Sequence, residues 1–197
     1  MKRTDIINQF IRNRQFQSYL EIGVRNPDDN FNLITAQYKS SVDPDPNAEA
    51  KFVMTSDEFF AQNCDKFDIV FIDGLHQCQQ TEKDIDNSLK FLNKNGVIVL
   101  HDCMPKEECH QYHEFQMGKW TGDVWKAFWR YRQISMFETY TVNTDWGCGV
   151  IDTGHISGIH AFDQWQSDYN QMTWEQFAKN HINMMNVITP QDFLRKF

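Results

Sequence analysis

The stretch that decides the fold is FDIVFIDGLH, residues 67–76. Most of its first six side chains are apolar, without the strict alternation of a half-exposed strand, and Gly74 ends the run. A strand that is apolar on both faces is typical of a parallel sheet with helices on both sides. Asp73 and His76, at the end of this strand, are therefore the first candidates for chemistry.

Strands and helices alternate outward from this stretch. Residues 18–24 are a short, largely apolar run that indicates a strand, residues 40–43 indicate a second short strand, and residues 97–100 (VIVL) indicate another. Apolar positions at helical spacing predict a helix over 79–92. This alternation predicts a Rossmann-like α/β fold, with a mostly parallel twisted sheet and helices on both faces.

Weaker patterns complete a sheet of about seven strands. A helix is expected from Asp29 or Asn30 to Tyr38, and residues 51–54 are a candidate strand. The last third of the chain differs, because two further strands are expected to pair as an antiparallel edge. The elements expected there are strands at 137–142 and 147–152 and helices at 123–132 and 173–185.

Length and composition fit one domain. The chain has 197 residues, of which 41% are hydrophobic, enough for one sizeable core. We expect residues 1–197 to form a single domain with three parts. These are a cofactor-binding core at 18–103, a substrate lid and helix at 104–135, and C-terminal strands and a helix at 136–197.

Charge and cysteine content predict a cytoplasmic protein. A net charge of −8 argues against a broad nucleic-acid surface, which needs basic residues. No apolar run is long enough to span a membrane, and the first ten residues lack the apolar region of a signal peptide. The five cysteines have no regular spacing and are expected to be reduced thiols. No nucleic-acid or membrane partner is expected, and homo-oligomerisation stays open.

The ends of the predicted strands carry the polar residues. In an open parallel sheet, ligands bind beyond the carboxyl ends of the strands. Each residue also has an ordinary interpretation, such as a turn residue, a helix cap or a solvated loop histidine. Their convergence on one edge is what indicates a site. The residues concerned are Glu21, Asp43, Asp73, His76, His101 and Asp102.

The turn after the first strand limits the choice of cofactor. A dinucleotide-binding turn needs G-x-G-x-x-G, but Gly23 is followed by VRNPD, and no phosphate-binding loop of the Walker type is present. A nucleoside without a run of phosphates fits better, and S-adenosylmethionine is one. At the other strand ends, Asp73, His101 and Asp102 are candidate ligands for a divalent cation. His76 is a candidate base, because imidazole titrates near neutral pH.

These motifs resemble the class I S-adenosylmethionine-dependent methyltransferases over about residues 18–152. Residues 19–24 are similar to the first motif of that family, and residues 42–44 to its ribose-binding strand end. The block from Asp73 to Asp102 resembles the macrocin-type O-methyltransferases. Residues 120–126 resemble a segment of related bacterial methyltransferases associated with surface glycans.

The resemblance implies a role for each site residue. The loop after the first strand would hold the methionine end, Asp43 the ribose, and the start of the next helix the adenine. The acids at two strand ends would hold magnesium, or a transition ion because one ligand is a histidine. The implied residues are Glu21, Gly23, Arg25, Asn26, Asp43, Ser56, Asp57 and Asp73 for the cofactor, Asp73, His101 and Asp102 for the metal, and His76 as the base.

The implied activity is O-methylation of a small-molecule or sugar hydroxyl. One departure from the family keeps an alternative open, because Arg25 and Pro27 stand where two further glycines are usual. The alternative is a non-catalytic cofactor-binding or partner protein on the same fold. A nucleotide-dependent oxidoreductase is disfavoured by the missing glycines.

Overall fold

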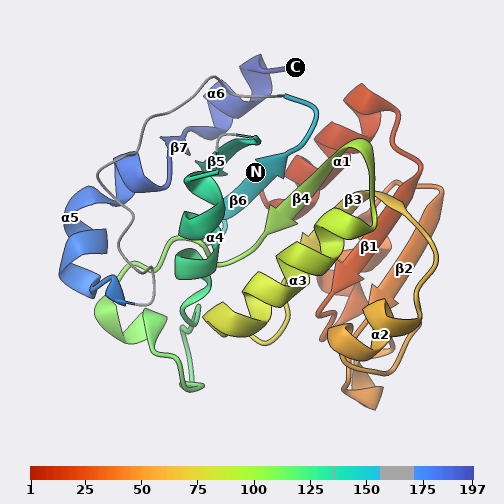
Figure 1. Ribbon diagram of the computed structural model, residues 1–197, viewed down its shortest axis with the longest axis horizontal. Helices are drawn as coiled ribbons and strands as arrows, with labels where there is room; N and C mark the ends of the chain where they lie inside the picture. Colours follow the sequence, from red (N-terminus) through yellow and green to blue (C-terminus); the bar gives the residue numbers. More distant parts are fainter. Residues whose placement is uncertain (135, 156–170) are drawn as a thin grey trace.

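A computed structural model describes residues 1–134, 136–155 and 171–197, and these residues form a seven-stranded sheet (Figure 1). The order across the sheet is β2-β1-β3-β4-β6-β5-β7. Neighbouring strands from β2 to β4 are parallel, whereas β6 is antiparallel to both β4 and β5. The strands are β1 (Ser18–Ile22), β2 (Tyr38–Val42), β3 (Phe67–Ile72), β4 (Leu92–Leu100), β5 (Glu138–Val142), β6 (Cys148–Asp152) and β7 (Val187–Ile188).

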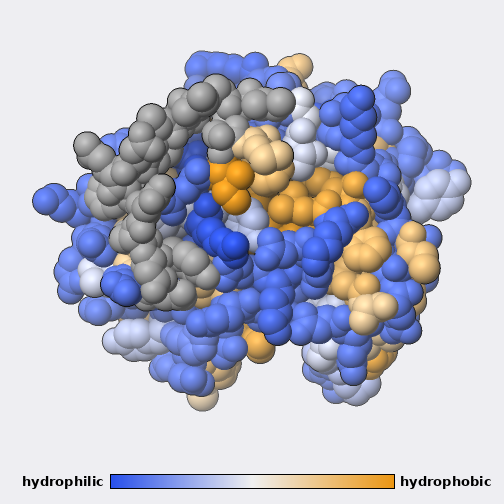
Figure 2. All heavy atoms as spheres, in the orientation of Figure 1, coloured by the Kyte–Doolittle hydropathy of each residue, from blue (hydrophilic) through white to orange (hydrophobic). Residues whose placement is uncertain are grey.

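Helices cover both faces of the sheet, each over its own apolar core. Alternate strand residues point to opposite faces, so Val70 and Ile72 join one core while Ile69 and Phe71 join the other. The first core packs under α2 (Ser56–Gln62), α3 (Cys78–Lys90), α4 (Val124–Arg132) and α5 (Trp174–Met184). The second packs under α1 (Arg3–Arg14) and α6 (Pro190–Arg195). Figure 2 shows the first face, where α3 turns hydrophilic side chains outward and hydrophobic residues appear beside it.

This architecture confirms the predicted fold class, including the antiparallel C-terminal edge. The division into 18–103, 104–135 and 136–197 stays a prediction, and residues 135 and 156–170 of it lie outside the described residues. All five cysteines are free thiols, as expected. Among the described residues, no helix has both the length and the apolar character needed to cross a membrane.

The predicted helix from Asp29 or Asn30 to Tyr38 is wrong. Two short 3-10 helices, η1 (Pro27–Asp29) and η2 (Phe31–Leu33), take its place. The reason is a tertiary contact with α1. The Asn8 side chain donates to the Leu33 carbonyl at 2.9 Å and accepts from the Thr35 N–H at 2.9 Å, so it holds this segment in a non-helical conformation.

The candidate strand at 51–54 is reduced to a single bridge between Phe52 and Val42. Phe52 exchanges backbone hydrogen bonds with Ser41 and Asp43, but Val53 is 52% exposed and has turned away from the sheet. As a result β2 remains the edge strand. The loop after β2 contains a 3-10 helix, η3 (Pro46–Ala48), and then Phe52, and it leads to α2 beside the cavity described below.

Candidate active site

One cavity of about 820 Å³ lies at the carboxyl ends of the parallel strands. Every predicted site residue except Asn26 lines it. The Asn26 side chain instead accepts a hydrogen bond from the Asp28 N–H at 3.1 Å and so caps η1. The sequence therefore predicted residues that share one cavity, and the cavity lining also includes residues that sequence reasoning did not assign.

Gly23 forms the floor of the cavity between β1 and β3. Its φ of +83° and its closeness to the neighbouring strand both require glycine, because a Cβ atom there would lie 2.1 Å from the Asp73 carbonyl oxygen. Arg25, two residues later, has a φ of +52°, the left-handed conformation that glycine usually supplies. The loop thus keeps a conformation that favours glycine at a position where the sequence has arginine.

Asp43 holds this loop against the end of β2. Its Oδ2 accepts hydrogen bonds from the N–H groups of Val24 at 2.8 Å and Arg25 at 3.0 Å, and its Oδ1 accepts from Asp45 at 2.9 Å. A carboxylate has about four acceptor positions. Asp43 therefore retains capacity to accept a further hydrogen bond, such as one from a ribose hydroxyl.

Glu21 is a buried carboxyl group at the end of β1. Burial raises its pKa to about 7, although hydrogen bonds from the Tyr19 hydroxyl and the Asn30 amide lower it. Both donors bond the same oxygen, Oε2. A carboxyl group poised near neutral pH in this position can become the partner of a bound ammonium group.

Ser56, which also lines the cavity, is hydrogen-bonded to Asp84 on α3. Thr55, rather than Ser56, is the N-cap of α2, so the Ser56 hydroxyl is free to donate to Asp84 Oδ1 at 2.6 Å. Gln80 donates to the same oxygen at 3.1 Å and to Asp57 Oδ1 at 3.2 Å. Burial raises the pKa of Asp84 to about 6.

We expect Asp84→Asn to stabilise the protein in a pH-dependent way. The folded-state pKa of Asp84 is raised from 3.8 to about 6, so the wild type loses stability as pH rises through this range. A shift of about two units corresponds to about 3 kcal/mol at pH 8. Urea unfolding should show a gain for the variant at pH 8 that narrows toward pH 4. The exposed Asp65→Asn serves as control, and an equal gain at both pH values would contradict the assignment.

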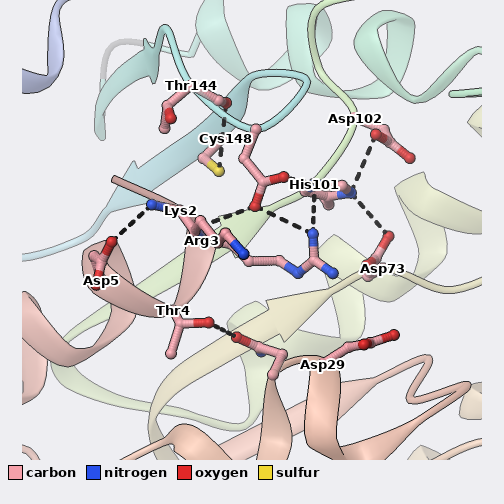
Figure 3. A network of polar contacts seen from close by, with 12 residues as sticks. Lys2, Arg3, Thr4, Asp5, Asp29, Asp73, His101, Asp102, Thr144 and Cys148 are labelled. Atoms are coloured by element: carbon pink, nitrogen blue, oxygen red, sulfur yellow. Dashed lines mark hydrogen bonds and ion pairs between the residues drawn. The ribbon is translucent and has the colours of Figure 1, made fainter.

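The ends of β3 and β4 bring two histidines and two acids together. Figure 3 shows three of these residues, Asp73, His101 and Asp102. His76 Nε2 lies 3.0 Å from Asp73 Oδ1, and its Nδ1 lies 3.3 Å from Asp102 Oδ2. His101 Nδ1 lies 3.3 Å from Asp73 Oδ1 and 3.1 Å from Asp102 Oδ1. Each histidine therefore contacts both carboxylates.

Burial and charge oppose each other in this cluster. Burial alone would raise the pKa of Asp73, but His101 and His76 lower it well below its usual range. Burial would lower the pKa of each histidine, but the neighbouring carboxylates raise both. The carboxylates therefore favour the protonated form of the imidazoles, and the imidazoles favour the ionised form of Asp73.

The cluster also contains possible metal ligands. Asp73, His76 and Asp102 each offer a ligand atom within 4.8 Å of the others. His76 Nδ1 is buried and, although it lies 3.3 Å from Asp102 Oδ2, it makes no hydrogen bond with the residues that the structure describes. The carboxylate and imidazole groups present thus fit a divalent cation. The sequence assigned His101 to this set, whereas this grouping contains His76, so the choice between the two imidazoles stays a prediction.

The segment before α4 covers His76. The φ of His76 is +59°, and its carbonyl accepts the Asp123 N–H at 3.2 Å. The Trp120 ring stacks on the imidazole, with ring centroids 5.2 Å apart. Trp125, five residues further along, is fully buried in the core. Only Trp120 of these two is therefore available to a ligand.

Three further cavity residues come from parts of the chain that strand-end reasoning does not reach. Arg3 is the first residue of α1, Asn30 lies between η1 and η2, and Asp145 lies in the turn between β5 and β6. Asp145 has a φ of +47°. No local sequence pattern marks them, because tertiary packing alone brings them to the cavity.

Solved structures share this fold. An O-methyltransferase from Bacillus cereus in complex with SAH is 13% identical, with a TM-score of 0.53 over 77% of this chain and 80% of that one. The O-methyltransferase TomG from Streptomyces achromogenes, in complex with SAM, is 13% identical, with a TM-score of 0.54 over 79% of each chain. The chain has the class I methyltransferase fold.

A family model also matches part of the chain at the level of sequence. Residues 13–103 match a family model described as a methyltransferase domain. Cofactor-bound Rv0187 from MTB is also similar in structure, with 13% identity and a TM-score of 0.58 over 77% of this chain and 79% of that one. Comparison with curated proteins gives no match. The matched segment contains β1 to β4, the strands whose ends form the cavity of this methyltransferase fold.

Proposed function

We propose that the protein is an S-adenosylmethionine-dependent O-methyltransferase. The observation that carries this proposal is that one cavity collects a polar group for each part of the donor and a histidine for the acceptor proton. Asp43 lies where the ribose hydroxyls would bind, and Glu21 where the methionyl end would bind. Ser56 and Asp57 lie on the adenine side.

The chemistry that follows is a single displacement. The acceptor hydroxyl oxygen forms a bond to the methyl carbon as the bond from sulfur to that carbon breaks. The hydroxyl proton passes to His76, and the products are a methyl ether and S-adenosylhomocysteine. Much of the rate acceleration is expected from holding oxygen, carbon and sulfur in line. To act as the base, His76 must first present an unprotonated nitrogen, so its contacts with Asp73 and Asp102 must loosen when substrate binds.

A divalent cation is the second part of the proposal. Asp73 and Asp102 would hold it with His101, which leaves His76 for the proton. A mixed oxygen and nitrogen ligand set suits transition ions better than magnesium. When bound, such an ion would lower the pKa of the acceptor hydroxyl and orient it.

The acceptor is proposed to be a hydroxyl of a small molecule or a sugar. The lining near His76 includes the aromatic rings of Trp120 and Phe115, whose centroids are 5.2 Å apart. Aromatic faces suit flat or sugar-like ligands. Acidic side chains outnumber basic ones in the cavity, which does not favour a nucleic-acid substrate.

Calorimetry with S-adenosylmethionine and S-adenosylhomocysteine tests this function. The wild type should bind both, and Asp43→Ala should weaken binding at least tenfold, because it removes a ribose acceptor and frees the loop N–H groups of Val24 and Arg25. Asp45→Ala, an exposed acid two residues away, should bind like the wild type. If the wild type binds neither ligand at millimolar concentration, the proposed function is wrong.

A further inference from the structure

Arg3 is the cation at the cavity whose role the fold does not explain. It is the first residue of α1, and it lines the cavity although its side chain is only 17% exposed. A long, charged side chain is rarely buried this far without a purpose. Figure 3 shows it reaching from α1 toward His101 and Asp73.

Asp145 fixes the position of Arg3. The Asp145 Oδ2 atom accepts hydrogen bonds from the Arg3 backbone N–H at 3.0 Å and from its Nη1 at 3.1 Å. The same Nη1 lies 3.0 Å from His101 Nε2. One edge of the guanidinium is therefore anchored, and its orientation in the cavity is set.

The other edge of the guanidinium is unused. Within the described residues, every side-chain hydrogen bond of Arg3 involves Nη1, and its Nε is buried with no partner. A buried N–H of a charged group without a partner is costly. The Nε and Nη2 edge of arginine is a planar pair of donors that matches the two oxygens of a carboxylate. A carboxylate ligand in the cavity would satisfy this unpaired edge.

Glu21 supplies the complementary charge nearby. Arg3 is close enough to lower the pKa of Glu21, against the larger effect of burial, which raises it. Glu21 is also linked to the start of α1 through Asn30, because Thr4 donates to the Asn30 amide oxygen at 2.7 Å and the Asn30 amide donates to Glu21 Oε2 at 3.0 Å. A cation and a carboxyl group held in one end of a cavity fit the two charges of an amino acid.

We propose that Arg3 binds the α-carboxylate of the methionyl group of the methyl donor, while Glu21 binds its ammonium group. This inference rests on the proposed function and adds a specificity-determining residue to it. The competing interpretation is purely structural, in which Arg3 only ties α1 to the β5–β6 turn through Asp145. The two differ in one respect, because only the first makes binding depend on the ligand carboxylate.

The experiment compares S-adenosylmethionine with its decarboxylated form, which keeps the sulfonium and the amine. Calorimetry with the wild type should show about ten- to a hundredfold tighter binding of S-adenosylmethionine, the range for a charge-assisted hydrogen-bonded pair. Arg3→Met should remove most of this preference by weakening S-adenosylmethionine alone. Arg12→Met, an exposed arginine on the same helix, should keep the preference.

Two results would overturn the inference. Equal affinity of the wild type for both ligands would do so without any variant, so the test does not depend on Arg3→Met folding. Equal weakening of both ligands in a folded Arg3→Met protein, checked by thermal unfolding, would leave Arg3 a structural residue. Binding of neither ligand by the wild type would instead remove the proposed function, and the inference with it.

Discussion

His76→Asn is expected to lower turnover by about 10²- to 10⁴-fold, the range for loss of a general base. Asparagine is the appropriate replacement because it tolerates the left-handed backbone that His76 adopts at φ +59° and can still hydrogen-bond. It has no nitrogen that titrates near neutral pH, so it cannot accept the hydroxyl proton. Affinity for S-adenosylhomocysteine, which carries no methyl group and needs no base, should change little.

Turnover is measured as release of S-adenosylhomocysteine from S-adenosylmethionine, with the best acceptor from a panel of monosaccharides and small phenols. His113→Asn is the matched control, since His113 lies in the same covering segment, contacts Asp123 at 3.1 Å and does not line the cavity. Retention of wild-type turnover by His76→Asn would exclude His76 as the base. The methyl-transfer proposal itself would then require another group to accept the proton.

The strands and the cavity were predictable because buried parallel strands appear in the sequence as short, continuous apolar runs. The runs at 67–72 and 97–100 are apolar on both faces, and the structure covers both faces with helices. Once the strands are known, their carboxyl ends are known, and an acid at each end is then a candidate. This reasoning placed Glu21, Asp43 and Asp73 on one cavity without any three-dimensional information.

The parts that could not be predicted depend on contacts between distant segments. Asn8 prevents a helix after η1 by bonding the backbone on either side of Ile34, and nothing in the local sequence indicates this. Arg3 reaches the cavity only because Asp145 meets the start of α1. Trp120 and Trp125 have the same local character, yet one lines the cavity and the other is buried in the core.

Gly23→Ala is expected to cost about 2–5 kcal/mol of unfolding free energy, from left-handed strain of about 1–2 kcal/mol and overpacking of about 1–3 kcal/mol. The new Cβ would collide with backbone atoms, because it would lie 2.1 Å from the Asp73 carbonyl oxygen and 2.7 Å from the Cα of Gly74. Relief requires β1 and β3 to separate at the floor of the cavity. Cofactor binding should therefore be lost even in molecules that remain folded.

Gly118→Ala separates the two contributions to this cost. Gly118 also has a positive φ, +100°, but a Cβ there meets no atom within 4 Å. Its variant should lose only the strain of about 1–2 kcal/mol, so the difference between the two variants measures the close approach of β1 to β3. Urea unfolding of both proteins, with S-adenosylhomocysteine calorimetry, makes the comparison. Equal losses of unfolding free energy in the two variants would mean that β1 and β3 separate at little cost. Gly23 would then be required for its backbone conformation alone.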